Sequence, residues 1–99
     1  MGEKRTSEER ALPQARQYLV GVWREAHFLA QVFMGLLPAP GQKETRFFPD
    51  DARLMLDLLD RLWPLVEGLL PEKERLEASL QLSSLRLMFA QRTQKEGNP

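Results

Sequence analysis

The sequence contains no cysteine among its 99 residues, which excludes disulfides, thiol catalysis and cysteine-based zinc sites. It has a single histidine and no glycine-rich phosphate loop, Ser-His-Asp set or metal-ligand spacing, so we expect no cofactor and no metal. Basic and acidic residues number 14 each, and this balance gives no overall field that would attract nucleic acid. These absences favour a non-enzymatic protein, and the lack of cysteine suits a cytoplasmic one.

Long hydrophobic runs are also absent. The most hydrophobic run extends from Phe28 to Leu37 and is interrupted by Gln31. A membrane-spanning helix needs roughly 20 apolar residues, about twice the length of this run. The first residues mix both charge signs and lead into no signal-peptide core. We therefore expect one domain with neither a membrane segment nor a targeting segment.

Hydrophobic spacing predicts an all-α fold. The predicted helices cover residues 12–37, 50–68 and 71–93. The first should end before Pro38, and Pro49 with two following acids should open the second. Because the joint before the third helix is short, the second and third should form an antiparallel hairpin, along which the long first helix packs. The single domain then spans 12–93, and the polar segments 1–11 and 94–99 should be flexible.

The third predicted helix carries two apolar rows in steps of three and four residues. The first, which we call the Leu76 seam, consists of Leu76, Leu80, Ser83, Leu87 and Ala90. The second, the Leu82 seam, consists of Ala78, Leu82, Leu85 and Phe89. At about 100° per residue the two rows lie on opposite sides of the helix. A surface helix of a small monomer needs only one apolar stripe, so the second must face another helix or another molecule.

We expect a second copy of the chain to cover this extra apolar surface. A chain of this length gains much of its stability from a shared core, and dimerisation would complete the fold. The alternative is that the third helix lies centrally, with the other two covering both of its sides. The predicted dimer interface consists of Leu19, Val22, Phe28, Leu29, Phe33, Leu82, Leu85 and Phe89. The leading function is accordingly a protein-protein interaction module, such as an adaptor or a small regulatory subunit.

A family resemblance supports the all-α prediction. Its motif comprises Ala52-Arg53, Leu56-Asp57-Leu58-Leu59, Leu62, Gly68, Leu70, Glu74, Leu80, Leu85-Arg86 and Met88-Phe89. Through these residues the chain resembles a family of small bacterial helical proteins catalogued as domain of unknown function 1844, over roughly residues 15–92. The resemblance implies a helical fold and bacterial origin, and it supplies no activity. The chain departs from the family pattern at Leu65-Val66, where members usually carry a Lys-Thr pair.

Few residues are candidates for chemistry. His27 lies at the edge of the apolar face of the first helix, where the residues one turn away offer no acidic or imidazole ligand, so we interpret it as a boundary residue. Asp57, Asp60 and Glu67 fall on the polar face of the second helix beside arginines, which indicates a solvated, ion-paired surface. Of these, Asp57 could pair across a subunit boundary. A pocket that joins His27 to two carboxylates would instead favour a small enzyme.

The alternative function is a nucleic-acid-associated factor. Arg86, Arg92 and Lys95 would form a basic patch with the N-terminal basic residues if the two ends of the chain met. On a helix these three point in different directions, and acidic neighbours dilute them, whereas nucleic-acid modules usually show a basic stripe. We therefore expect a homodimer, with an unidentified protein as a further possible partner, and no nucleic acid, membrane or small-molecule substrate.

Overall fold

The computed structural model describes the backbone of residues 2–97 and the side chains of residues 14–94. The elements of this part are α1 (Gly2–Phe33), α2 (Pro49–Val66), the short 3-10 helix η1 (Glu67–Leu69) and α3 (Glu72–Gly97). The all-α prediction is confirmed, since the described residues contain no strand beyond an isolated bridge between Met34 and Phe47. Within the described part, no helix combines the length and apolarity needed to cross a membrane.

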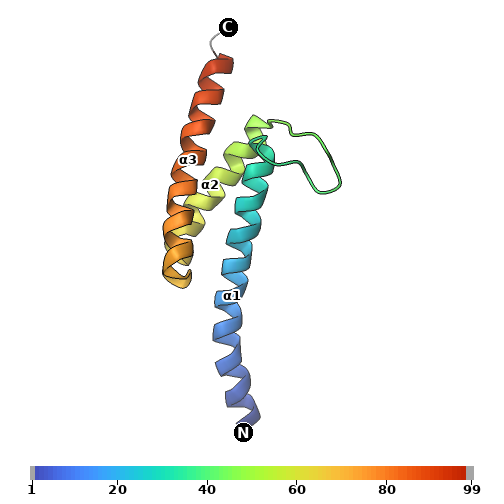
Figure 1. Cartoon of the computed structure of the whole chain (residues 1–99). Coiled ribbons are helices and arrows are strands. Elements are labelled where there is room, and N and C mark those ends of the chain that lie inside the picture. The colour runs from blue at the N-terminus through green and yellow to red at the C-terminus, as the bar shows by residue number, and fades with distance from the viewer. Residues whose placement is uncertain (1, 98–99) are drawn as a thin grey trace.

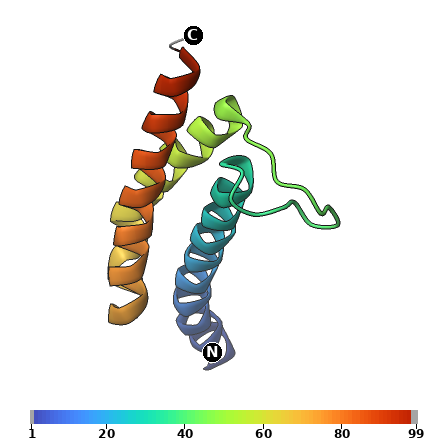
Figure 2. The same cartoon turned by 45° about the horizontal axis from the view of Figure 1, so that its top comes forward.

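Helix α2 packs against both other helices, whereas α1 and α3 contact each other little (Figures 1 and 2). The N-terminal half of α1 projects beyond the other helices, as Figure 1 shows. The molecule measures 67 × 28 × 21 Å, and its radius of gyration of 17.0 Å exceeds the roughly 13 Å expected for a compact domain of this length. The elongated arrangement leaves a large part of the helix surface without cover from the chain itself.

The boundaries of α1 differ from the prediction at both ends. The helix begins at Gly2 rather than at residue 12, because the opening segment is rich in good helix formers. It ends at Phe33 rather than at residue 37, since Gly35 adopts a φ of +80°, which ends the helix before Pro38 is reached. A Cβ at Gly35 would lie 3.3 Å from two backbone atoms of the returning loop, so glycine is also required there for space.

Segments 1–11 and 94–99 were predicted to be flexible, and nearly all of their side chains lie outside the described part. The backbone of residues 2–11 is helical, and α3 continues to Gly97, four residues past its predicted end. The two helices after the loop otherwise match their predicted positions closely.

The loop between α1 and α2 returns to the end of α1 and touches α3. The backbone N–H of Phe48 donates a hydrogen bond to the carbonyl of Phe33 at 2.8 Å, and the two rings meet edge to face at 6.0 Å. Phe47 meets Phe89 of α3 in the same way at 6.4 Å, and the Arg92 guanidinium lies 5.2 Å from the centre of the Phe47 ring. The loop therefore packs Phe47 against α3 and Phe48 against the end of α1.

The buried core runs along α2 and the facing sides of its two neighbours. Its members are Trp23, Ala26, Ala30, Met34, Ala52, Leu56, Leu59, Val66, Leu70, Ala78, Leu82 and Leu85. Leu82 and Leu85 are each only 3% exposed, so the Leu82 seam is the inner side of α3. Their assignment to a dimer interface is corrected, because α2 and the core residues of this same chain already cover them.

The other predicted interface residues are also mostly covered within the chain. Leu19, Phe33 and Phe89 pack against the core, and Val22 and Leu29 are half-buried, whereas Phe28 stays exposed. The buried stripe at the end of α1 consists of Trp23, Ala26 and Ala30, and the predicted interface residues Val22 and Leu29 lie at its edge. Because apolar residues cover more than one face of α1, their spacing alone did not fix which side turns inward.

Candidate functional site

The Leu76 seam lies exposed along the outer side of α3. Leu76, Leu80 and Leu87 are 58%, 73% and 61% exposed, and the other two members of the seam, Ser83 and Ala90, are exposed as well. The seam is exposed because it lies opposite the Leu82 seam, which is turned into the core. A single exposed leucine means little, but three in one row, with Ser83 as its one polar member, form an uncharged stripe that is suited to an interaction site.

A second exposed row lies on α2. Leu54 and Leu65 are 65% and 59% exposed, and Leu58 between them is 38% exposed. Arg61 occupies the position between Leu58 and Leu65 in this row, so a charge interrupts the apolar stripe. None of the five members of the Leu76 seam is charged, which makes this row the more suitable apolar contact surface.

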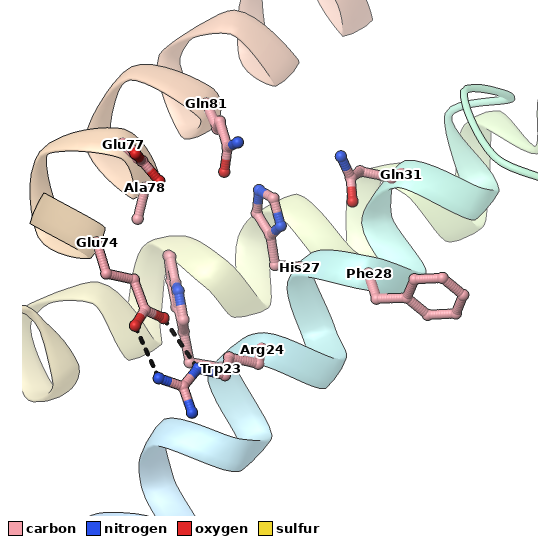
Figure 3. Close-up of a pocket in the computed structure, with 9 residues that line it drawn as sticks. All are labelled: Trp23, Arg24, His27, Phe28, Gln31, Glu74, Glu77, Ala78 and Gln81. Atoms are coloured by element: carbon pink, nitrogen blue, oxygen red, sulfur yellow. Dashed lines mark hydrogen bonds and ion pairs between the residues drawn. The ribbon is translucent and has the colours of Figure 1, made fainter. Parts of the chain in front are cut away.

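A cleft of about 270 Å³ separates α1 from α3, and Figure 3 shows the side chains that line it. Those from α1 are Trp23, Arg24, His27, Phe28 and Gln31, and those from α3 are Glu74, Glu77, Ala78 and Gln81. Its volume approaches the lower end of the range for small-ligand pockets, about 300 Å³. The cleft is the candidate site for a small molecule, whereas the Leu76 seam is the candidate site for a protein.

An ion pair closes one end of the cleft. The Arg24 guanidinium donates two hydrogen bonds to the Glu74 carboxylate, from Nε to Oε2 at 2.9 Å and from Nη2 to Oε1 at 2.7 Å. These hydrogen bonds lower the pKa of Glu74 and raise the pKa of Arg24. Because both side chains are partly exposed, the pair is worth roughly 0.2–1 kcal/mol, and its main effect is to tie α1 to α3.

His27 lines the α1 side of the cleft between Trp23 and Gln31 (Figure 3). Its Nε2 atom is buried and has no hydrogen-bond partner among the described residues, while its ring stacks on Trp23 at a centroid distance of 6.3 Å. Burial lowers the pKa of His27 below its ordinary value of 6.5, so the imidazole is neutral at neutral pH. A half-buried position at the edge of the apolar face is where the sequence interpretation placed it.

The cleft brings His27 together with Glu74 and Glu77, which is the arrangement that would favour a small enzyme. Within the described part, however, no hydrogen bond joins the imidazole to either carboxylate, and Glu74 is engaged by Arg24. A general base must be oriented by hydrogen bonds toward the group it activates. The cleft therefore collects polar groups without assembling an acid-base pair.

The sequence interpretation missed the other polar members of the cleft. Arg24 and Gln31 flank His27 at intervals of three and four residues, and Glu74, Glu77 and Gln81 repeat these intervals on α3. Each helix thus carries a polar row beside its buried stripe, which is visible in the sequence. That the two rows face each other depends on how the helices pack, which the sequence spacing does not reveal.

The predicted acidic cluster of α2 remains on the surface. Asp57 and Glu67 are exposed, and Asp60 forms an ion pair with Arg86 of α3. The described residues contain no group of three or more side chains placed to hold a metal ion. A role for Asp57 across a subunit boundary stays a prediction.

Comparisons with known proteins give no relative: no protein-family model, no curated protein and no solved structure matches the chain. The resemblance to the domain-of-unknown-function family 1844 therefore stays a prediction, and the function has to be argued from geometry.

His27 gives a prediction for the pH dependence of stability. Its pKa is lowered in the folded state, so the unfolded chain binds the proton first, and the free energy of unfolding should fall as the pH drops below about 6.5. His27→Gln should make the free energy of unfolding fall less steeply below this pH, as measured by urea titrations followed by circular dichroism. Arg24, Glu74 and Glu77 are the charged residues that line the same cleft as the imidazole, so Glu77→Gln serves as a control that should keep the slope. If the pH dependence of stability were unchanged in His27→Gln, it could not be assigned to His27.

Proposed function

We propose that the protein is a non-enzymatic interaction module that self-associates through the Leu76 seam of α3 and acts as an adaptor or small regulatory subunit. The observation that supports this proposal is the exposure of Leu76, Leu80 and Leu87 in one uncharged row. Bacterial origin and a cytoplasmic location belong to the same proposal, on the sequence arguments given above.

The expected strength of association follows from the area that pairing would cover. Fully burying a leucine is worth about 1.5–3 kcal/mol, so each of these half-exposed leucines contributes roughly 1–2 kcal/mol. Two copies of the seam supply six such leucines, which together give on the order of 6–12 kcal/mol. Association costs at least about 4 kcal/mol in lost freedom of motion, so the net gain is at most about 8 kcal/mol, and any dimer should be reversible and form only at micromolar or higher concentration.

The elongated shape supports the same proposal. A chain with a radius of gyration of 17.0 Å covers less of its helix surface than a compact domain would, and the outer side of α3 is among the uncovered parts. A partner helix laid along the seam would cover it.

The nucleic-acid alternative loses support from the contacts of its basic residues. Arg86 is paired with Asp60, and Arg92 donates a hydrogen bond to the carbonyl of Met34 while lying over Phe47. Lys95, the third residue of the predicted patch, has its side chain outside the described part. Binding to nucleic acid would weaken steeply as salt is raised, whereas burial of leucines would not.

Static light scattering tests the proposal directly. The unmodified chain should give a mass approaching twice 11.5 kDa as its concentration is raised. Leu76→Glu combined with Leu80→Glu should return the mass to that of one chain, because four carboxylates would be brought into the apolar contact. The matched control is Leu54→Glu with Leu58→Glu on the exposed row of α2, which should leave the dimer intact.

Circular dichroism checks that both double variants keep their helices. A single-chain mass for the unmodified protein at high concentration would reject self-association. A folded dimer from the Leu76/Leu80 variant would reject this seam as the interface.

A further inference from the structure

We propose that two copies of this chain pair through their α3 helices in antiparallel orientation, with Leu76 against Leu87 of the partner subunit. The inference rests on the proposed self-association and adds its direction and register. Figures 1 and 2 show α3 along one side of the molecule with α1 and α2 both on its other side, so the outer face is open to a second copy.

The spacing of the seam matches that of a helix which packs lengthwise against another. Leu76, Leu80, Ser83, Leu87 and Ala90 alternate steps of four and three residues, as in the paired helices of a coiled coil. Lys73 precedes the first of them by three residues and extends the same row. The row therefore spans about 25 Å from Lys73 to Ala90 at 1.5 Å per residue.

The sizes of the side chains favour the antiparallel orientation. With the two-fold axis between residues 81 and 82, Leu80 lies opposite Ser83 of the partner subunit and Leu76 lies opposite the partner subunit's Leu87. Lys73 lies opposite Ala90 of the partner subunit. In two of these three pairings a long side chain meets a small one, and only Leu76 and Leu87 are both long. Alternation of large and small side chains lets the two helices pack closely.

The parallel orientation would stack each residue on its own copy. Ser83 would meet Ser83 and Ala90 would meet Ala90, which leaves two layers underfilled. Lys73 would meet Lys73 at the same level, placing two ammonium groups side by side. The antiparallel orientation moves the two lysines about 25 Å apart, which is beyond the Debye length of roughly 8–10 Å at ordinary salt.

The helix dipoles point the same way. Antiparallel pairing opposes the two dipoles of the α3 helices, whereas parallel pairing aligns them. The charged side chains at the two ends of α3 do not decide the direction, because Glu74, Arg86 and Arg92 are engaged within the chain by Arg24, Asp60 and the Met34 carbonyl.

Engineered cysteines test the orientation cleanly because the natural chain has none. We expect Lys73→Cys and Ala90→Cys, mixed and oxidised, to form the mixed disulfide, since their Cα atoms face each other across the antiparallel pair. Ala90→Cys alone should stay unlinked, because its two copies lie about 25 Å apart. Ser83→Cys lies near the axis in either orientation, so crosslinking with a short bismaleimide reports association whatever the direction.

The outcomes separate this inference from the function on which it rests. A dominant Ala90→Cys homodimer would overturn the antiparallel orientation while leaving self-association standing. A statistical mixture of mixed and identical disulfides would overturn a fixed register. A single-chain mass by light scattering, together with no bismaleimide product from Ser83→Cys, would overturn both.

Discussion

Leu82→Glu is expected to unfold the chain, whereas Leu80→Glu should leave it folded. The two leucines are separated by one residue on α3, yet Leu80 is 73% exposed and Leu82 is 3% exposed. Removing the buried leucine costs about 2–5 kcal/mol, and an unpaired carboxylate in its place adds several kcal/mol more. Because small domains are stable by only about 5–15 kcal/mol, this loss is enough to prevent folding. The exposed substitution should change the free energy of unfolding by no more than about 0.5 kcal/mol.

Urea titrations followed by far-ultraviolet circular dichroism measure both effects. They should be run at several protein concentrations, since a dimer adds a concentration-dependent contribution to stability and Leu80 lies in the proposed contact. The milder Leu82→Ala keeps the comparison informative if the glutamate variant yields no folded protein. Equal stability of the two glutamate variants would mean that the Leu82 seam is not the inner side of α3.

The helices were predictable because the sequence marks them locally. Pro49 with its two acids opens α2, and the joint between α2 and α3 carries Gly68 and Pro71, which punctuate the chain there. The end of α1 was predicted less well. Pro38 suggested a later stop, but the helix ends earlier because Gly35 takes a left-handed conformation and lies against the returning loop.

The inward side of α3 was not predictable from its own sequence. Its two seams have the same period and similar apolar content, so helical spacing leaves the choice between them open. The choice is made by contacts from distant parts of the chain: Phe47 of the loop meets Phe89, and Arg92 reaches the Met34 carbonyl at the end of α1. Both contacts lie on the side of the Leu82 seam. They therefore identify that seam as internal and leave the Leu76 seam exposed.

The cleft between α1 and α3 could not be predicted from the sequence for the same reason. The polar rows around His27 and Glu77 can be seen in each helix, but the Arg24–Glu74 pair joins residues that are 50 positions apart. Such a pairing depends on the angle at which α1 and α3 cross α2, and no local pattern encodes that angle. Sequence spacing therefore identified the elements and their apolar faces, whereas their pairing required the structure.

Trp23→Ala is expected to destabilise the chain by about 3–5 kcal/mol, the usual cost of removing a large buried aromatic side chain. Trp23 is 2% exposed, and its ring lies 5.2 Å from that of Trp63 on α2 and 6.3 Å from that of His27. The aromatic pair between α1 and α2 is worth roughly 0.5–1.5 kcal/mol beyond the apolar area it covers. The matched control is Tyr18→Ala on the same helix, which removes an aromatic side chain that is 72% exposed.

The control should change stability by less than about 0.5 kcal/mol, measured by urea titration with circular dichroism rather than tryptophan fluorescence. Trp23 also forms a wall of the cleft, so its loss should admit water to His27 and return the pKa of that imidazole toward 6.5. An NMR titration of the His27 ring protons in still-folded Trp23→Ala protein measures this second effect. If Trp23→Ala were as mild as Tyr18→Ala, the α1–α2 contact would not be the centre of the core. If stability fell but the pKa of His27 did not rise, then Trp23 would support the fold without shielding the imidazole from water.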